Sequence, residues 1–121
     1  MQVGSTPDEK KKEIEWVTRG LNVHVKRAVL SGLAHFAPQR SLEVIVAILE
    51  QEYSVDFERL AENTGTLKFA FTRMFGGGAP VVEIRISKEL ARDMGVEFDG
   101  RSLDELIIML RAANETLAPA H

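Results

Sequence analysis

Two strongly apolar segments meet at three consecutive glycines and a proline, and this junction constrains the fold more than any other stretch of the sequence. The segments lie within residues 69–86, and Gly76, Gly77 and Gly78 separate them just before Pro80. Glycine adopts backbone angles that other residues avoid, and proline fixes its φ angle and lacks an N–H donor. The fold class therefore depends on what the two segments form on either side of this break.

A β-hairpin is one interpretation of this region. Residues 66–73 and 82–86 alternate apolar with less apolar side chains and are rich in residues that suit a pleated surface. The glycine-rich segment between them supplies a turn. This pattern gives the alternative fold class, an α+β domain with a β-hairpin at 66–87.

Two helices joined at a corner are the other interpretation, because the same region also has a helical period. The apolar residues that share a helical face are Leu67, Phe71, Met74 and Phe75 before the glycines, and Val82, Ile86, Leu90 and Met94 after them. Pro80 suits the first turn of a helix, and Gly95 marks the end of the second one. On the period alone, both interpretations remain open.

The N-terminal third of the chain has a helical pattern with clear breaks. An apolar stripe begins at Ile14 and is interrupted at Gly20. Asn22 is placed to cap a second start, and Pro38 ends the helix that follows. The sequence thus predicts separate helices on the two sides of Gly20.

The next stretch predicts one long and one short helix. Ser41 is the expected N-cap of the longer helix, whose apolar excess at Val44 and Ile48 predicts a central position. A short helix is expected over residues 57–62. Gly65 is expected to end it in a left-handed conformation.

The last helix begins with a capping box, in which Ser102 accepts from a backbone N–H and Glu105 reaches back to the serine. Its expected core stripe is Leu103, Leu106, Ile107, Leu110 and Ala113. Ile108 and Met109 point away from that stripe, so the helix has apolar residues on more than one side.

If residues on both sides of the triple glycine are helical as well, the fold is all-α, a compact orthogonal array of about five to six short helices. A chain of 121 residues is long enough for one domain with its own core. We expect a single helical domain over residues 11–115, a mobile N-terminal tail over 1–10 and a C-terminal tail over 116–121.

No motif in the sequence carries specific catalytic or cofactor chemistry. The absence of cysteine excludes disulfides, zinc–thiolate sites and thiol nucleophiles. His24 and His35 are eleven residues apart, about 16 Å along a helix, which is too far for one metal ion. The triple glycine is not followed by the lysine and hydroxyl residue of a phosphate-binding loop. We therefore expect no enzyme activity, no cofactor and no metal.

The sequence also bears on location and membranes. No run approaches the roughly 20 apolar residues that a membrane helix needs. The N-terminus lacks the apolar segment of a signal peptide. The expectation is a cytoplasmic protein without a membrane partner.

Charge is distributed unevenly along a chain whose formal net charge is −3. Residues 16–42 contain no acid, whereas residues 43–62 contain six acids. The cations of the first segment are Arg19, Lys26, Arg27 and Arg40. Either the two segments form neighbouring helices with complementary surfaces, or the first keeps a basic face for an anionic partner.

The stretch from Ser41 to Ala112 resembles the Nitrosopumilus output domains, an archaeal helical domain family. The resemblance is carried by residues 48–56, by residues 74–79 with the helix that follows them, and by the amphipathic helix from Leu103. It implies an all-α fold with a helix–helix junction at Phe75 and Gly76, and on this resemblance we take two helices rather than a hairpin as the prediction for this region. It also implies an output or accessory module of archaeal signalling proteins without established chemistry.

The predicted function is a non-enzymatic helical interaction or output module that binds a protein partner or associates with itself. The candidate partner surface is Trp16, Arg19, Lys26, Arg27, Arg40, Ile108 and Met109. The predicted structural hinge is Gly76, Gly77, Gly78 and Pro80.

Two alternative functions remain open at this point. One is a nucleic-acid-binding regulator that uses the basic segment 19–40, although the acidic net charge disfavours nucleic acid as a partner. The other is a small-molecule sensor whose pocket between helices is lined by Phe69, Phe71, Met74 and Phe75. The simpler interpretation of these four side chains is that they fill the core.

Overall fold

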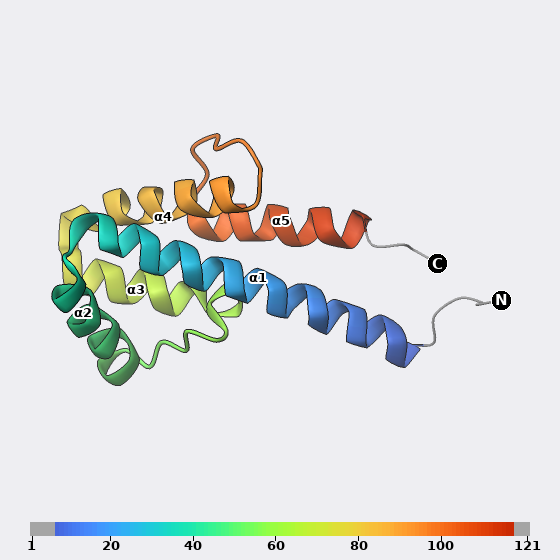
Figure 1. The fold of residues 1–121 in the computed structure, drawn as a ribbon, viewed down its shortest axis with the longest axis horizontal. Helices are drawn as coiled ribbons and strands as arrows, with labels where there is room; N and C mark the ends of the chain where they lie inside the picture. The colour runs from blue at the N-terminus through green and yellow to red at the C-terminus, as the bar shows by residue number, and fades with distance from the viewer. Residues whose placement is uncertain (1–6, 118–121) are drawn as a thin grey trace.

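The computed structural model of the chain is built from helices (Figure 1). It describes the backbone of residues 7–117 and the side chains of residues 20–113. The elements are α1 (Pro7–Phe36), α2 (Gln39–Glu52), η1 (Leu60–Glu62), α3 (Thr64–Phe75), η2 (Gly76–Gly78), α4 (Ala79–Asp93) and α5 (Leu103–Leu117), where η denotes a short 3-10 helix. No strand occurs within residues 7–117, so the all-α class is confirmed and the hairpin at 66–87 is wrong.

Helix α1 is one continuous helix of 30 residues rather than two short ones. Gly20 lies inside it and does not interrupt it, so the predicted number of short helices is slightly off. A glycine costs a helix only about 1 kcal/mol, and the burial of Leu21 and Val25 just after it outweighs that cost. The helix begins at Pro7, within the stretch expected to be a tail; residues 1–6 and 118–121 lie outside the described part of the chain.

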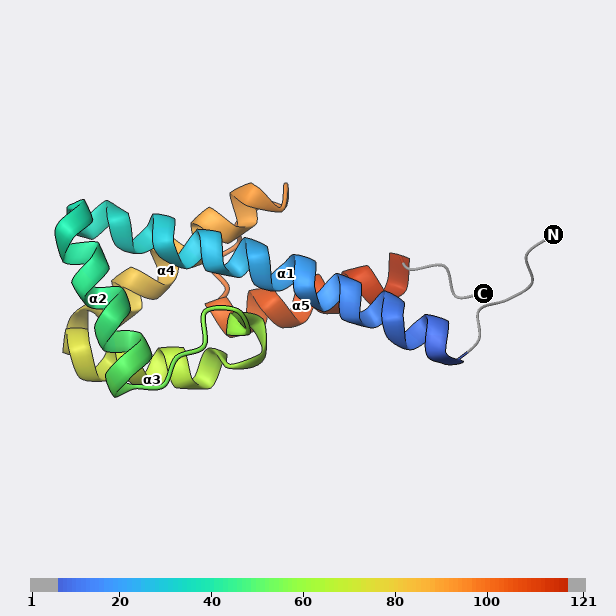
Figure 2. The same cartoon turned by 60° about the horizontal axis from the view of Figure 1, so that its bottom comes forward.

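The triple glycine forms a corner between two helices. Helix α3 ends at Phe75, the 3-10 turn η2 holds the three glycines, and α4 starts directly after it at Ala79. Gly76 has a φ angle of 54°, which glycine adopts without strain. Pro80 lies in the first turn of α4, where its missing N–H is not needed. The chain therefore reverses direction at η2, as Figures 1 and 2 show.

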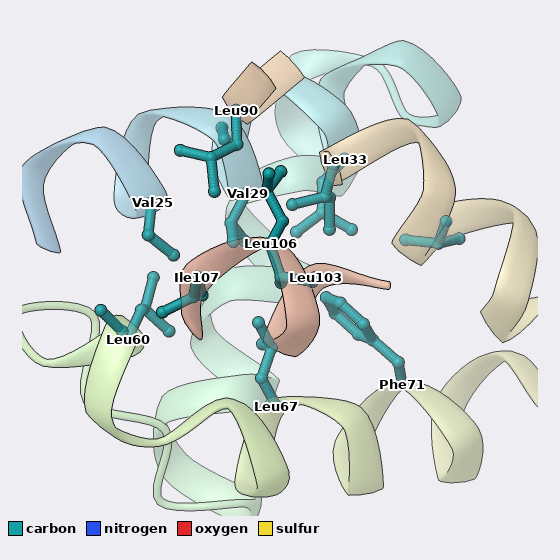
Figure 3. Close-up of a cluster of buried hydrophobic side chains, with 14 of the residues drawn as sticks. Val25, Val29, Leu33, Leu60, Leu67, Phe71, Leu90, Leu103, Leu106 and Ile107 are labelled. Atoms are coloured by element: carbon teal, nitrogen blue, oxygen red, sulfur yellow. The ribbon is translucent and has the colours of Figure 1, made fainter. Parts of the chain in front are cut away.

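The core lies between α1, α4, α3 and α5, with η1 closing one side. Figure 3 shows Val25, Val29, Leu33, Leu60, Leu67, Phe71, Leu90, Leu103, Leu106 and Ile107 pointing toward one another, and all ten are buried. Helix α1 packs along α4 more extensively than along any other element. These two helices are thus the centre of the fold.

Helix α2 was expected to be central and instead lies at the edge. Its main packing is against α1, and Leu49 is fully buried while Val44 is 58% exposed. Ser41 is not its N-cap, because the helix already starts at Gln39, and no side chain of the described chain caps it. Some of the apolar side chains of α2 therefore face solvent, because the neighbouring elements cover only part of this helix.

Asn22 does not cap a helix within α1; its side chain fixes η1 to α1. The Oδ1 atom accepts the backbone N–H of Ala61 at 2.7 Å, and Nδ2 donates to Glu62 at 3.3 Å. The short helix expected over 57–62 is reduced to this 3-10 turn. Gly65 does not end it in a left-handed conformation, since it lies in the first turn of α3.

The predicted end of α4 and the predicted start of α5 agree with the structure, whereas α5 continues to Leu117, into the stretch expected to be a tail. Gly95 has a φ angle of 71°, and the N–H of Val96 donates to the carbonyl of Ala91 at 2.9 Å, which closes α4. At the start of α5, the N–H of Glu105 donates to Ser102 Oγ at 3.4 Å, and the N–H of Ser102 donates to Glu105 Oε1 at 3.3 Å. This is the predicted capping box.

The core stripe of α5 also agrees with its prediction, apart from its last residue. Leu103, Leu106, Ile107 and Leu110 are buried, whereas Ala113 is exposed. Among the residues that the structure describes, no helix has the length and apolar character needed to cross a membrane.

Candidate interaction surfaces

Two of the cations predicted for a partner surface are engaged within the chain. Lys26 Nζ lies 2.7 Å from Glu58 Oε2, and Arg27 Nη1 lies 3.3 Å from Asp93 Oδ2. The first pair joins the basic segment to the acidic one, as the interpretation of complementary surfaces predicts. Both cations are therefore partly neutralised, which weighs against a basic face for nucleic acid.

The remaining predicted cations and Trp16 are placed differently. Arg40 is exposed near the start of α2. Trp16 and Arg19 belong to α1, but their side chains lie outside the residues whose side chains the structure describes. The predicted surface residues thus do not come together as one patch within the described chain.

His24 and Asp93 connect α1 to the end of α4. His24 Nδ1 lies 2.6 Å from Asp93 Oδ2, and Arg27 reaches the same carboxylate. Asp93 is the last residue of α4, where the partial negative charge of the helix end disfavours an acid. The hydrogen bond from His24, followed by the charge of Arg27, lowers the pKa of Asp93. This cluster has the geometry of a structural clamp between two helices.

A second clamp is formed by Glu89, a buried carboxylate on α4. Ser31 Oγ donates to Glu89 Oε1 at 3.1 Å, and Arg85 Nη2 lies 3.6 Å from the same oxygen. Arg92 pairs with the other oxygen. Because a buried carboxylate is stable only when it is paired, these contacts explain Glu89 without a catalytic role.

The four side chains considered as a sensor pocket have different surroundings in the described part of the chain. Phe71 is fully buried in the core, whereas Phe69 is 61% exposed and packs edge-on against Tyr53. Met74 and Phe75 are half-buried. Because one of these side chains is buried, one is exposed and two are half-buried, they are poorly placed to form a shared ligand site. The burial of Phe71 favours a structural role for it.

An apolar depression, here called the corner hollow, lies where the ends of α1 and α3 meet the starts of α2 and α4. Its volume is about 460 Å³. It is lined by Leu33, Phe36, Ala37, Ile45, Phe75, Gly78, Val81 and Val82. Phe36 is 49% exposed and Val81 is 58% exposed, so the hollow is bordered by apolar side chains that face solvent.

The sequence analysis missed the corner hollow. Phe36 precedes Pro38 and Val81 follows Pro80, so apolar residues at helix ends beside prolines were the available signal. That signal is weak, because it does not show that the two helix ends lie together.

Ile108 and Met109 on α5 have different surroundings. Ile108 is 66% exposed, whereas Met109 is half-buried and packs against the core. Single exposed apolar side chains are common on soluble proteins. Ile108 alone is therefore a weaker candidate for a partner contact than the corner hollow.

A second depression, here called the acidic hollow, lies between α1, α2 and the loop after α2. Its volume is about 560 Å³. It is lined by Lys26, Leu30, Val46, Glu50, Ser54, Val55, Asp56, Phe57 and Glu58. Its apolar floor and acidic border distinguish it from the corner hollow.

The described residues offer no group of three or more His, Asp or Glu side chains that is arranged to hold a metal ion. Comparisons of the chain with models of protein families, with curated proteins and with solved structures find no match. The resemblance of residues 41–112 to an archaeal output domain therefore stays a prediction.

Proposed function

We propose that this chain is a non-enzymatic helical interaction module that binds a protein partner through the corner hollow. The observation that carries the proposal is the exposure of Phe36 and Val81 beside a depression lined by apolar side chains. Partner-binding surfaces concentrate aromatic and aliphatic side chains at their centre, and a concave apolar site accepts an anchor residue of the partner.

The setting of this module follows from the family resemblance. We propose an output or accessory role in archaeal signalling or regulation, in the cytoplasm. The junction between α3 and α4 at Phe75 and Gly76 is compatible with the helix–helix junction that the resemblance implies. The proposal of this role rests on residues 41–112 alone.

The test compares binding by matched surface variants. The full chain is immobilised and exposed to an extract of the source cells, and bound proteins are identified for the wild type, Val81→Glu and Val23→Glu. Val23 is 55% exposed on α1 and lies outside the corner hollow, so it controls for adding a charge to an exposed valine. Circular dichroism checks that both variants keep the helical fold.

The expected result is a protein that the wild type and Val23→Glu retain and that Val81→Glu loses at least tenfold. Equal retention by all three chains would remove the corner hollow from the proposal. An Ile108→Glu variant in the same experiment shows whether α5 contributes to binding.

A further inference from the structure

The outer face of α4 is positively charged, whereas the acidic hollow is negatively charged. This face is defined by Ile84, Arg85, Lys88 and Arg92, which follow one another at helical spacing. Ile84 is 45% exposed and Lys88 is exposed. Arg85 and Arg92 share the single carboxylate of Glu89, so the face keeps two positive charges in excess.

The acidic hollow keeps two negative charges in excess. Its acids are Glu50, Asp56 and Glu58, and its cation Lys26 pairs with Glu58. Its floor includes Val55 and Phe57, which are 4% and 6% exposed. A depression of about 560 Å³ has room for an aliphatic side chain and the cations beside it.

We propose that the chain associates with itself, the outer face of α4 of one copy docking into the acidic hollow of the next. Ile84 meets the apolar floor, and Lys88 meets Glu50 and Asp56. The opposite charges and the combination of an aliphatic ridge with an apolar-floored depression carry this assignment. It concerns surfaces other than the corner hollow and is independent of the partner proposed there.

The position of the two surfaces determines the type of assembly. Helix α4 packs on α1 near Gly32, whereas the acidic hollow includes Leu30 of α1. Residues two positions apart on a helix point about 200° apart, so the surfaces lie on opposite sides of α1. Figure 1 agrees, with α4 above α1 and the loop after α2 below it.

A closed two-fold dimer needs both surfaces on one side of the molecule, so this contact is head-to-tail. Head-to-tail contacts produce open chains or rings. The mean mass should therefore rise progressively with protein concentration rather than stop at a dimer.

Sedimentation velocity across a concentration series at low ionic strength tests the proposal. The wild type should form larger species as concentration rises, and added salt should reverse this, since the contact depends on exposed charges. Lys88→Glu and Glu50→Lys should each weaken association at least tenfold. The double variant with both substitutions should recover it, because the charges are exchanged and remain complementary.

Two controls carry the same charge changes elsewhere. Arg73→Glu on α3 and Glu97→Lys in the loop before α5 alter exposed residues outside both surfaces and should leave association unchanged. A wild type that stays monomeric throughout, or a double variant no better than its parents, overturns the proposal. Binding of a basic peptide to a strictly monomeric wild type also overturns it and assigns the acidic hollow to a foreign cationic partner.

Discussion

Gly32 of α1 lies directly against Ile86 of α4. A Cβ atom placed on Gly32 would come within 2.6 Å of Ile86 Cγ1 and 3.2 Å of Ile86 Cα. Ile86 is completely buried, and a backbone atom cannot move aside as a flexible side chain does. The close approach of the two central helices therefore depends on the absence of a side chain at residue 32.

Replacing Gly32 with alanine should destabilise the fold. Overpacking a tight core costs about 1–3 kcal/mol, and the better helix propensity of alanine returns about 1 kcal/mol of that. We expect a net loss of up to about 2 kcal/mol in the free energy of unfolding, measured by urea denaturation. Gly20→Ala in the same helix is the matched control, since its added Cβ has no atom of the described chain within 4 Å beyond its chain neighbours and the adjacent backbone of its own helix.

Gly20→Ala should stabilise the protein by up to about 1 kcal/mol. A Gly32→Ala variant as stable as Gly20→Ala would show that α1 and α4 separate without penalty and that the contact with Ile86 does not limit their packing.

Removing the side chain of Asn22 should release η1 from α1. Asn22 is 6% exposed, and it satisfies the buried N–H of Ala61 across 39 residues of sequence. Asn22→Ala leaves that N–H without its acceptor, which costs about 1–3 kcal/mol of unfolding free energy. Hydrogen exchange of the Ala61 amide should also accelerate.

Asn63→Ala provides the comparison, because its side-chain amide donates to the carbonyl of Arg59 at an exposed position. The loss of unfolding free energy in Asn63→Ala should be clearly smaller than the loss in Asn22→Ala. Equal losses would mean that η1 is held by apolar packing alone.

Local chemistry explains which parts of the fold were predictable. Pro38, Gly95 and the pair Ser102 and Glu105 act on their own neighbours in sequence, and the structure places helix ends at each of them. The failure at Gly20 has a tertiary cause, because buried residues after it hold α1 together. Gly65 lacks the left-handed backbone predicted for it, whereas Ser54 in the loop after α2 has a φ angle of 56° that no pattern marks.

The candidate surfaces were less predictable because they combine distant residues. The corner hollow needs Phe36 beside Val81, and the acidic hollow needs Lys26 beside Glu58. Helical spacing determines which side chains share a face of one helix, but it does not give the angle at which two helices cross. Spacing alone therefore could not show whether Lys26 and Arg27 form salt bridges within the chain or leave a free basic face. The structure pairs Lys26 with Glu58 and Arg27 with Asp93.

The capping box of α5 should contribute measurable stability. Ser102→Ala removes the acceptor of the Glu105 N–H and also the hydroxyl that hydrogen-bonds Asp104 and Glu105 and lowers the pKa of both carboxyls. Loss of an N-cap serine costs about 1 kcal/mol. Thermal unfolding followed by circular dichroism measures the loss.

Ser41→Ala is the matched control for this prediction. Ser41 is exposed and sits inside α2, where it caps nothing in the described chain. Its replacement should leave the melting temperature unchanged or slightly higher, because alanine is the better helix former. A loss equal to that of Ser102→Ala would contradict the assignment of caps.

The clamp at Asp93 should make stability depend on pH in the acid range. The hydrogen bond from His24 and the charge of Arg27 hold the pKa of Asp93 below its ordinary value of 3.8 in the folded chain. Such a carboxylate stabilises the fold above the unfolded pKa, and this contribution is lost as pH falls through the folded pKa. Asp93→Asn should therefore lower the unfolding free energy above about pH 4, with a difference from the wild type that disappears under stronger acid.

Glu83→Gln should change the pH profile in the opposite sense. Burial raises the pKa of Glu83 above 4.5 against the attraction of Lys68, so its ionisation is less favourable in the folded chain than in the unfolded one. The wild type then loses stability as pH rises through that raised pKa, whereas the glutamine variant does not. Urea denaturation from acid to neutral pH measures the free energy of unfolding of Glu83→Gln and Asp93→Asn. If both substitutions changed its pH dependence in the same direction, the opposite environments of the two carboxyls would be contradicted.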